Sequence, residues 1–133
     1  MLKYIQRIKR FLRIWGALYL YMGFMWYLSS KPFRIPFFDF PYRDKIVHIL
    51  EYSVFGYLLT RAFSINEIIK PGVLFAFAIM ALSLSWGIID EIHQSYVPSR
   101  NPEMLDVVCD VIGAMAGCHI FAKGSFKRFV KHY

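Results

Sequence analysis

Charge is scarce in this chain. Only 19% of its 133 residues are Asp, Glu, Lys or Arg, whereas 57% are hydrophobic and 19% are aromatic. A soluble domain carries about a quarter charged residues and fewer aromatic ones. The composition therefore argues against an ordinary soluble protein and favours a small all-α integral membrane protein, with a single domain over residues 1–133.

Cysteine is also rare, since only Cys109 and Cys118 are present. Their spacing in a continuous helix places them on opposite faces, about 13 Å apart along the axis. That distance excludes a disulfide between them. The sequence has no close pair of cysteine or histidine ligands either, so it gives no strong signal for zinc.

Acidic residues are the minority among the charges, with 9 Asp and Glu against 16 Lys and Arg and a net charge of +7. Much of the positive charge lies at the two ends of the chain, and no DNA- or RNA-binding motif accompanies it. We therefore expect no nucleic-acid partner. We interpret the basic residues as a signal of membrane topology and of contact with anionic lipid.

Four apolar segments cover about residues 11–29, 46–63, 73–92 and 105–122. Each is close to the roughly 20 residues that a helix needs to cross a bilayer. They predict a four-helix bundle in the membrane. Lys and Arg are more frequent at the two ends and in the second loop than in the other loops, which predicts that both termini are cytoplasmic.

This topology places the start of the second helix, the end of the third and the start of the fourth on the extracytoplasmic side. Polar residues are concentrated at these helix ends, where charges beside the membrane are costly and mark a functional site by default. They follow helical spacing, so that those of one helix share a face. The predicted site residues are Asp44, Lys45, His48, Tyr52, Asp90, Glu91, Gln94, Arg100, Asp106 and Asp110.

Below its carboxylates, the fourth helix carries Gly113 and Gly117 on the same face. Small residues at this spacing form a surface for close helix packing in membranes. On the second helix, Gly56 offers another point of close approach. These glycines predict that the carboxylates of the fourth helix point into the bundle instead of toward lipid.

The order and spacing of these residues resemble the VanZ-like family of small bacterial membrane proteins, over residues of about 20 to 120. The resemblance rests on Asp44-Lys45-x-x-His48-x-x-x-Tyr52, Asp90-Glu91-x-x-Gln94-x-x-x-Pro98-x-Arg100 and Asp106-x-x-x-Asp110-x-x-Gly113-x-x-x-Gly117. It implies a multi-pass protein of the bacterial inner (cytoplasmic) membrane and a link to resistance against the glycopeptide teicoplanin. Asp110 departs from the frequent Asn of the family and adds a candidate anionic or metal ligand.

Three of the residues are candidates for catalysis. His48 has the chemistry of a general base or a metal ligand, because imidazole titrates near neutral pH. Asp90 and Glu91 can polarise a water molecule or hold a cation. The alternative is structural: His48 would hydrogen-bond to a carboxylate, and the two acids would form salt bridges with Lys45 or Arg100.

The other predicted residues are candidates for binding. Arg100 is the best anion ligand, because its forked donors match a phosphate or carboxylate, and Lys45 would assist it. Asp106 and Asp110 are candidate metal ligands, although Asp106 also fits the N-cap of a helix. We interpret His93 as a solvent-facing residue. Asp44, Tyr52 and Gln94 complete the binding candidates.

Two hypotheses follow from this pattern. In the first, the site binds or processes an anionic membrane lipid or a lipid-linked envelope precursor, with the reaction unassigned because no lipid-phosphatase signature is present. In the second, the protein is a non-enzymatic scaffold or partner and the polar cluster is an ionic lock. An open pocket with unpaired groups would favour the first. The sequence leaves the metal, any cofactor and the oligomeric state open.

Overall fold

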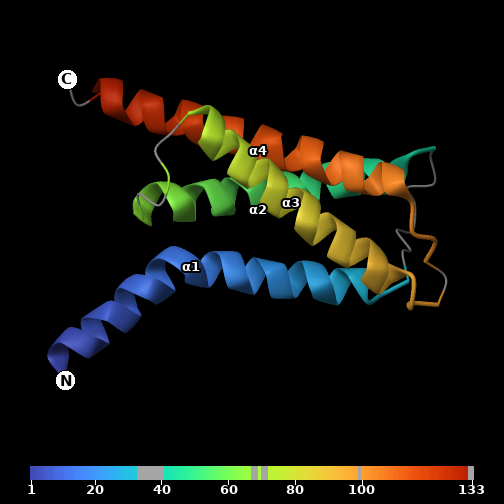
Figure 1. Cartoon of the computed structure of the whole chain (residues 1–133), viewed down its shortest axis with the longest axis horizontal. Coiled ribbons are helices and arrows are strands. Elements are labelled where there is room, and N and C mark those ends of the chain that lie inside the picture. Colours follow the sequence, from blue (N-terminus) through green and yellow to red (C-terminus); the bar gives the residue numbers. More distant parts are fainter. Residues whose placement is uncertain (33–40, 67–68, 70–71, 99, 132–133) are drawn as a thin grey trace.

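The computed structural model describes residues 1–32, 41–66, 69, 72–98 and 100–131, without the side chains of residues 125–131. Within these residues the chain is all-α, with four helices and no strands. The helices are α1 (Leu2–Ser29), α2 (Arg43–Asn66), α3 (Val73–Gln94) and α4 (Met104–Lys131), as Figure 1 shows.

The four helices occur where the apolar segments predicted them, but two of them are much longer. Helix α1 begins at Leu2 and includes the basic stretch before its apolar part, and α4 continues to Lys131. Lys and Arg are good helix formers, and no proline interrupts either extension. The hydropathy pattern therefore located the apolar part of each helix and missed the basic turns that continue it.

Helices α2 and α4 pack most closely. A Cβ atom added at Gly113 or Gly117 of α4 would collide with the backbone of α2, and one added at Gly56 of α2 would collide with the backbone of Ala114. The predicted small-residue surface is thus observed at the α2–α4 interface. It brings the two backbones together and fixes the positions of the polar residues at their ends.

Helix α1 lies against α2 and contributes Ile14, Leu18 and Met25 to the hydrophobic core. Near its C-terminal end, the Tyr21 hydroxyl donates a hydrogen bond to the Glu51 carbonyl oxygen at 3.0 Å. These contacts hold the end of α1 beside the start of α2.

Two of the helices, α3 and α4, are long and apolar enough to cross a membrane, over Val73–Gln94 and Met104–Gly124. Only 28% and 39% of their most apolar windows are buried inside the protein, so most of that surface faces outward. The less apolar α1 and α2 carry charges along their length, including Arg13 and Arg61.

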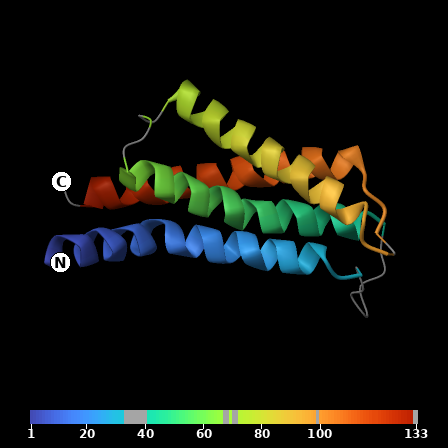
Figure 2. The same cartoon turned by 60° about the horizontal axis from the view of Figure 1, so that its bottom comes forward.

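The helix ends that carry the polar residues gather at one end of the molecule. Figures 1 and 2 both show the end of α1, the start of α2, the end of α3 and the start of α4 at the end opposite the two chain termini. This arrangement is the one that the alternating direction of the helices predicts. It brings residues more than a whole helix apart in sequence into one site.

Candidate functional site

Lys45 forms the centre of an ion-pair group that we call the lysine cluster: Lys45, Asp44, Glu103 and Asp106. Its Nζ atom lies 2.6 Å from Asp44 Oδ2, 2.6 Å from Glu103 Oε2 and 3.0 Å from Asp106 Oδ1. Lys45 and Asp106 are buried. The cluster joins the first turn of α2 to the first turn of α4 and to the loop before it.

The charges of the cluster shift one another's protonation. Burial disfavours the ammonium of Lys45, but the hydrogen bonds that it donates to its three carboxylate partners outweigh burial and raise its pKa above the usual range. For Asp44, burial favours the neutral acid, but the bond from Lys45 outweighs it and lowers the pKa. Both groups are therefore charged near neutral pH, and the positive charge of Lys45 is already matched by carboxylates.

This geometry gives two of the predicted site residues partners within the chain. Lys45, predicted to assist in holding an anion, instead donates to carboxylates of its own chain. Asp106 pairs with Lys45, and its backbone N–H bonds to the Glu103 carbonyl oxygen at 2.9 Å. Sequence reasoning did not select Glu103. Its position one turn before Asp106, at the same helix end, was the signal that could have identified it.

A second pair, His48 and Asp110, connects α2 to α4. His48 Nδ1 lies 2.8 Å from Asp110 Oδ1, and Asp110 is 0% exposed. Gly87 of α3 makes room for this carboxylate, since a Cβ atom there would lie 2.8 Å from Asp110 Oδ2. A buried carboxylate on one ring nitrogen orients an imidazole and sets its tautomer. His48 is therefore a histidine with a fixed ring orientation, and the carboxylate that it pairs with is Asp110.

Tyr52 lies one turn deeper on the same face of α2. It is fully buried, and its ring centroid is 6.5 Å from that of His48 in a stacked arrangement. It also contacts Phe55 edge-on, with ring centroids 5.7 Å apart. Tyr52 thus packs in the hydrophobic core next to His48, between the polar end of the bundle and its apolar interior.

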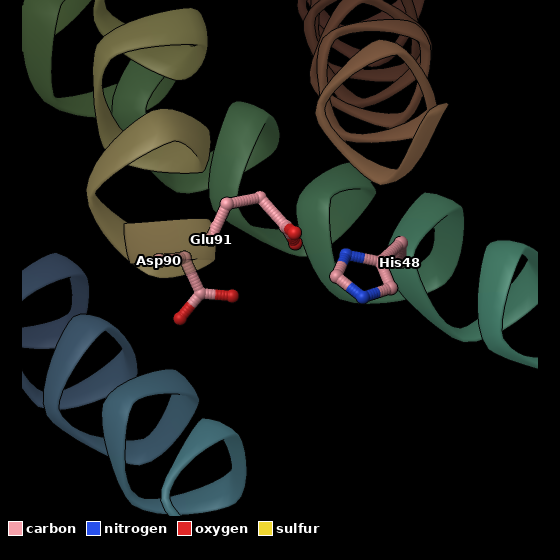
Figure 3. A group of neighbouring side chains, drawn as sticks. All are labelled: His48, Asp90 and Glu91. Atoms are coloured by element: carbon pink, nitrogen blue, oxygen red, sulfur yellow. The ribbon is translucent and has the colours of Figure 1, made fainter. Parts of the chain in front are cut away.

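The acids at the end of α3 face His48. Figure 3 shows the Glu91 side chain extending toward His48, with the Asp90 carboxylate beside it. One candidate ligand atom from each of the three residues lies within 4.8 Å of those of the other two. Asp90 Oδ2 accepts a hydrogen bond from Gln94 Nε2, and Glu91 Oε2 accepts one from the Glu103 backbone N–H, both at 2.8 Å.

Beside these acids is a cavity of about 310 Å³, which we call the end pocket. It lies where α1, α2 and α3 meet, and it contains five of the predicted site residues. The lining residues are Leu28, Ser29, Lys31, Pro32, Asp44, Val47, His48, Glu51, Asp90, Gln94 and Arg100. Glu51 also belongs to the polar residues on the His48 face of its helix, three residues further on, but the sequence assigned it no catalytic or binding role.

Arg100 reaches the pocket from the loop between α3 and α4. Its Nε donates to the Lys31 carbonyl oxygen at 2.9 Å, and one Nη donates to the Leu28 carbonyl oxygen at 3.2 Å. The last carbonyl groups of a helix lack partners within the helix and carry partial negative charge, so they favour a cation. Arg100 thus fixes the end of α1 while its guanidinium lines the pocket.

The interpretation of His93 as solvent-facing is wrong. Its ring stacks on Trp26 of α1 at a centroid distance of 3.9 Å, and its Nε2 lies 2.9 Å from Ser30 Oγ. It is half-buried. Helix α1 covers this face of α3, so that His93 connects the two helices.

The acidic residues that the structure describes are concentrated at one end of the bundle. Every Asp and Glu that the structure describes lies at this end of the bundle, in the lysine cluster, the end pocket or the groups that face them. The positive net charge of the chain is therefore carried elsewhere, mainly at the opposite end with the termini. The candidate site is acidic within a basic protein.

Fold and site together define a four-helix protein with a buried acidic centre and a polar pocket at one end of the bundle. A family model described as VanZ/LLP1 matches residues 5–127, which is nearly the whole chain. The chain belongs to the VanZ/LLP1 family, in agreement with its motifs. No curated protein and no solved structure matches it.

Proposed function

We propose that this VanZ/LLP1 chain is a multi-pass protein of the bacterial cytoplasmic membrane whose end pocket binds the phosphorylated headgroup of a membrane lipid or of a lipid-linked envelope precursor. The observation that carries the proposal is the end pocket, a cavity of about 310 Å³ lined by ionisable side chains at the end of an otherwise apolar bundle.

The outer surface of the bundle supports the membrane location. Large apolar side chains are exposed along α1, α2, α3 and α4, where lipid tails would cover them. They include Leu20, Phe24, Leu50, Phe77, Ile89, Ile112 and Ile120. With both termini in the cytoplasm, as the Lys and Arg distribution predicts, the end pocket would face the extracytoplasmic surface.

The size and chemistry of the pocket support a headgroup as the ligand. Its volume is at the lower end of the range for small-molecule sites, which fits a phosphorylated headgroup and leaves the tails outside between exposed apolar side chains. Arg100 and Lys31 provide positive charge at its wall. A guanidinium held in place by backbone carbonyl groups keeps its positive charge at a fixed position in the pocket wall, where it attracts phosphate oxygens.

His48 gives the pocket a group for proton transfer. It lines the cavity, and the bond to Asp110 fixes the orientation of its ring. An imidazole in this setting can accept a proton from a bound water molecule or donate one to a ligand oxygen. Asp90, at the same wall, would share this role, and a carboxylate oxygen of Glu91 lies within 4.8 Å of a candidate ligand atom of each of them.

The alternative function, a membrane scaffold held by an ionic lock, has support from the lysine cluster, in which Lys45 reaches three carboxylates. That cluster lies between α2 and α4. The end pocket lies between α1, α2 and α3, and the neighbouring Glu91 Oε1 and Asp110 Oδ2 are buried without hydrogen-bond partners among the described residues. A lock would pair such atoms, so the scaffold reading accounts for only the lysine cluster.

The family resemblance extends the proposal to antibiotic susceptibility. A protein that binds a lipid-linked precursor or changes the outer leaflet would alter the response to teicoplanin, which acts there. We expect expression of the wild-type chain to raise the teicoplanin concentration that inhibits growth. Asp90→Asn should abolish that increase at equal protein level, and an unchanged effect would separate the pocket from resistance.

The central test is binding of a polyprenyl phosphate to the purified chain in detergent, compared with Arg100→Lys. The ammonium of lysine cannot reproduce the planar fork, so we expect the affinity to fall about tenfold, the equivalent of 1.4 kcal/mol. Arg61→Lys is the matched control, because Arg61 also donates to α1 carbonyl oxygens, those of Ile14 and Arg13, but far from the pocket. Equal affinity for all three proteins would refute the headgroup assignment.

A further inference from the structure

Carboxylates line part of the end pocket, and they would repel a negatively charged ligand. A phosphorylated headgroup would approach Asp90 and Glu51, while Lys45, the nearest ammonium on α2, is engaged in the lysine cluster. We propose that His48, Asp90 and Glu91 bind a divalent first-row transition ion, Zn²⁺ or Mn²⁺, which then presents positive charge to the phosphate. The role of the ion toward phosphate rests on the proposed headgroup function; the ion site itself does not.

The geometry of the three side chains fits one ion. They come from α2 and α3, and their candidate ligand atoms all lie within 4.8 Å of one another (Figure 3). Metal–ligand bonds of about 2.0–2.2 Å place opposite ligands roughly 4 Å apart, so small side-chain rotations are sufficient to close the site. His48, Asp90 and Glu91 are 6%, 7% and 7% exposed, which makes this a buried set of donors at a pocket wall.

An unpaired atom points independently to a ligand. Glu91 Oε1 is buried and has no hydrogen-bond partner among the described residues. Within that part of the chain, neither Asp90 nor Glu91 forms an ion pair with Lys or Arg, and their hydrogen-bond donors are a neutral amide and a backbone N–H. Buried carboxylates without a compensating cation are costly. A bound ion would remove that cost.

The lysine cluster provides an internal comparison. Asp44, Glu103 and Asp106 form a second acidic group with metal-like spacing. There, however, the Lys45 ammonium already occupies the position of a cation, within 3.0 Å of all three carboxylates. The fold thus neutralises one acidic group with its own lysine. The group around Glu91 has His48 in place of a lysine, and histidine is a metal ligand.

The surroundings of His48 are those of a metal-binding histidine. A histidine that binds a metal through one ring nitrogen almost always donates a hydrogen bond from the other. The acceptor is a carboxylate, a carbonyl group or water, and it orients the ring. Asp110, fully buried and 2.8 Å from Nδ1, supplies that carboxylate. Its second oxygen lies beside Gly87 of α3, where a Cβ atom would be only 2.8 Å away.

The donor set selects the class of ion. One imidazole and two carboxylates suit Zn²⁺ or Mn²⁺, whereas Ca²⁺ and Mg²⁺ prefer oxygen ligands alone. Three protein ligands leave at least one coordination position for water or a phosphate oxygen. Because His48 and Asp90 also line the end pocket, that position would be reached from the cavity.

The test is direct ion binding to the full-length chain, purified in detergent and freed of metal with a chelator. Calorimetric titration with Zn²⁺, Mn²⁺, Mg²⁺ and Ca²⁺ should show one saturable site per chain for Zn²⁺ or Mn²⁺. Glu91→Gln and Asp90→Asn should each weaken binding about 10- to 100-fold, the range that perturbed metal sites show. Glu103→Gln is the matched control and should bind as the wild type does, since Glu103 belongs to the lysine cluster.

Two further measurements keep the outcome clear. Circular dichroism will show that each variant is folded, and the visible absorption of Co²⁺ bound to the wild type will report an imidazole and carboxylate environment without any substitution. The ion site is overturned by a lack of saturable Zn²⁺ or Mn²⁺ binding, by binding of Mg²⁺ or Ca²⁺ alone, or by an equal effect of Glu103→Gln and Glu91→Gln.

The ion site and the headgroup function fail separately. Polyprenyl phosphate binding is measured with the metal-free chain, with and without Zn²⁺. If the ion binds but the lipid does not bind in either state, the ion site stands and the proposed function falls. If the lipid binds equally in both states, the proposed function stands and the role of the ion in phosphate recognition falls.

Discussion

The α2–α4 interface allows a sharp test of how the site is positioned. Replacing Gly117 with alanine adds a single Cβ atom, which would meet the Ser53 carbonyl oxygen, with the Tyr57 backbone N at only 2.7 Å. Ordinary Cβ contacts are 3.4–4 Å. Both obstacles are backbone atoms that no side-chain rotation can move, so α2 and α4 must separate.

Overpacking of this kind costs about 1–3 kcal/mol, and we expect the upper part of that range because backbone atoms form the obstacle. For a chain of this size, each kcal/mol lowers the melting temperature by roughly 4 °C. The expected result for Gly117→Ala is therefore a decrease of roughly 8–12 °C in the thermal unfolding midpoint, measured by circular dichroism in detergent. Separation of the helices should also weaken the contact between His48 and Asp110.

Gly23→Ala is the matched control. Gly23 also lies inside a helix, but a Cβ atom there meets nothing within 4 Å. Alanine is favoured over glycine in a helix by about 1 kcal/mol, so this variant should be as stable as the wild type or more stable. Equal melting temperatures for Gly117→Ala and Gly23→Ala would refute close α2–α4 packing and, with it, the placement of the polar helix ends.

Three further predictions concern the polar end. Gly87→Ala should leave the helices assembled but displace the Asp110 carboxylate, so the affinity for the headgroup should fall while the melting temperature changes little. A lower melting temperature with unchanged affinity would make Asp110 a purely structural residue. Lys45→Met should lower the free energy of unfolding by an amount near the lower end of about 3–5 kcal/mol, because three carboxylates lose their cation while two of them keep contact with solvent; denaturant titration showing no loss would exclude the lock. The pKa of Asp44 is lowered in the folded protein, so its ionised form stabilises the fold above the unfolded pKa, and that contribution disappears as the pH falls below about 4. Asp44→Asn should therefore flatten the dependence of the melting temperature on pH in this acid range. An unchanged dependence would contradict the ion pair between Asp44 and Lys45 as the cause.

The two acidic groups at this end of the bundle differ in how their negative charge is balanced. Lys45 neutralises the group between α2 and α4, the two helices whose backbones the glycine contacts bring close together. The group beside the end pocket has a histidine and an unpaired carboxylate oxygen instead. A closely packed, internally neutralised interface would hold the adjoining pocket in shape, as the residues around a functional site support its side chains.

Local patterns in the sequence were sufficient to predict the helices and the end of the bundle that carries the polar residues. Apolar periodicity depends only on neighbouring residues, and helix direction alternates with each short loop. For the same reason, Gly113 and Gly117 could be assigned to a packing face, because they lie one turn apart on one helix. The extra basic turns of α1 and α4 were missed, since a hydropathy pattern records lipid contact rather than backbone conformation.

Only the tertiary structure decided which polar groups pair. The sequence allowed several carboxylates as partners of His48, and in the structure the partner is Asp110. The sequence made Lys45 a candidate anion ligand, and in the structure its ammonium pairs with Glu103 and Asp106. It placed Arg100 in a loop, where its contact with the α1 carbonyl groups could not be read. These choices depend on the rotation and height of each helix relative to its neighbours. A shift of one residue turns a side chain by about 100°, and backbone collisions between helices, rather than any local spacing, set that rotation.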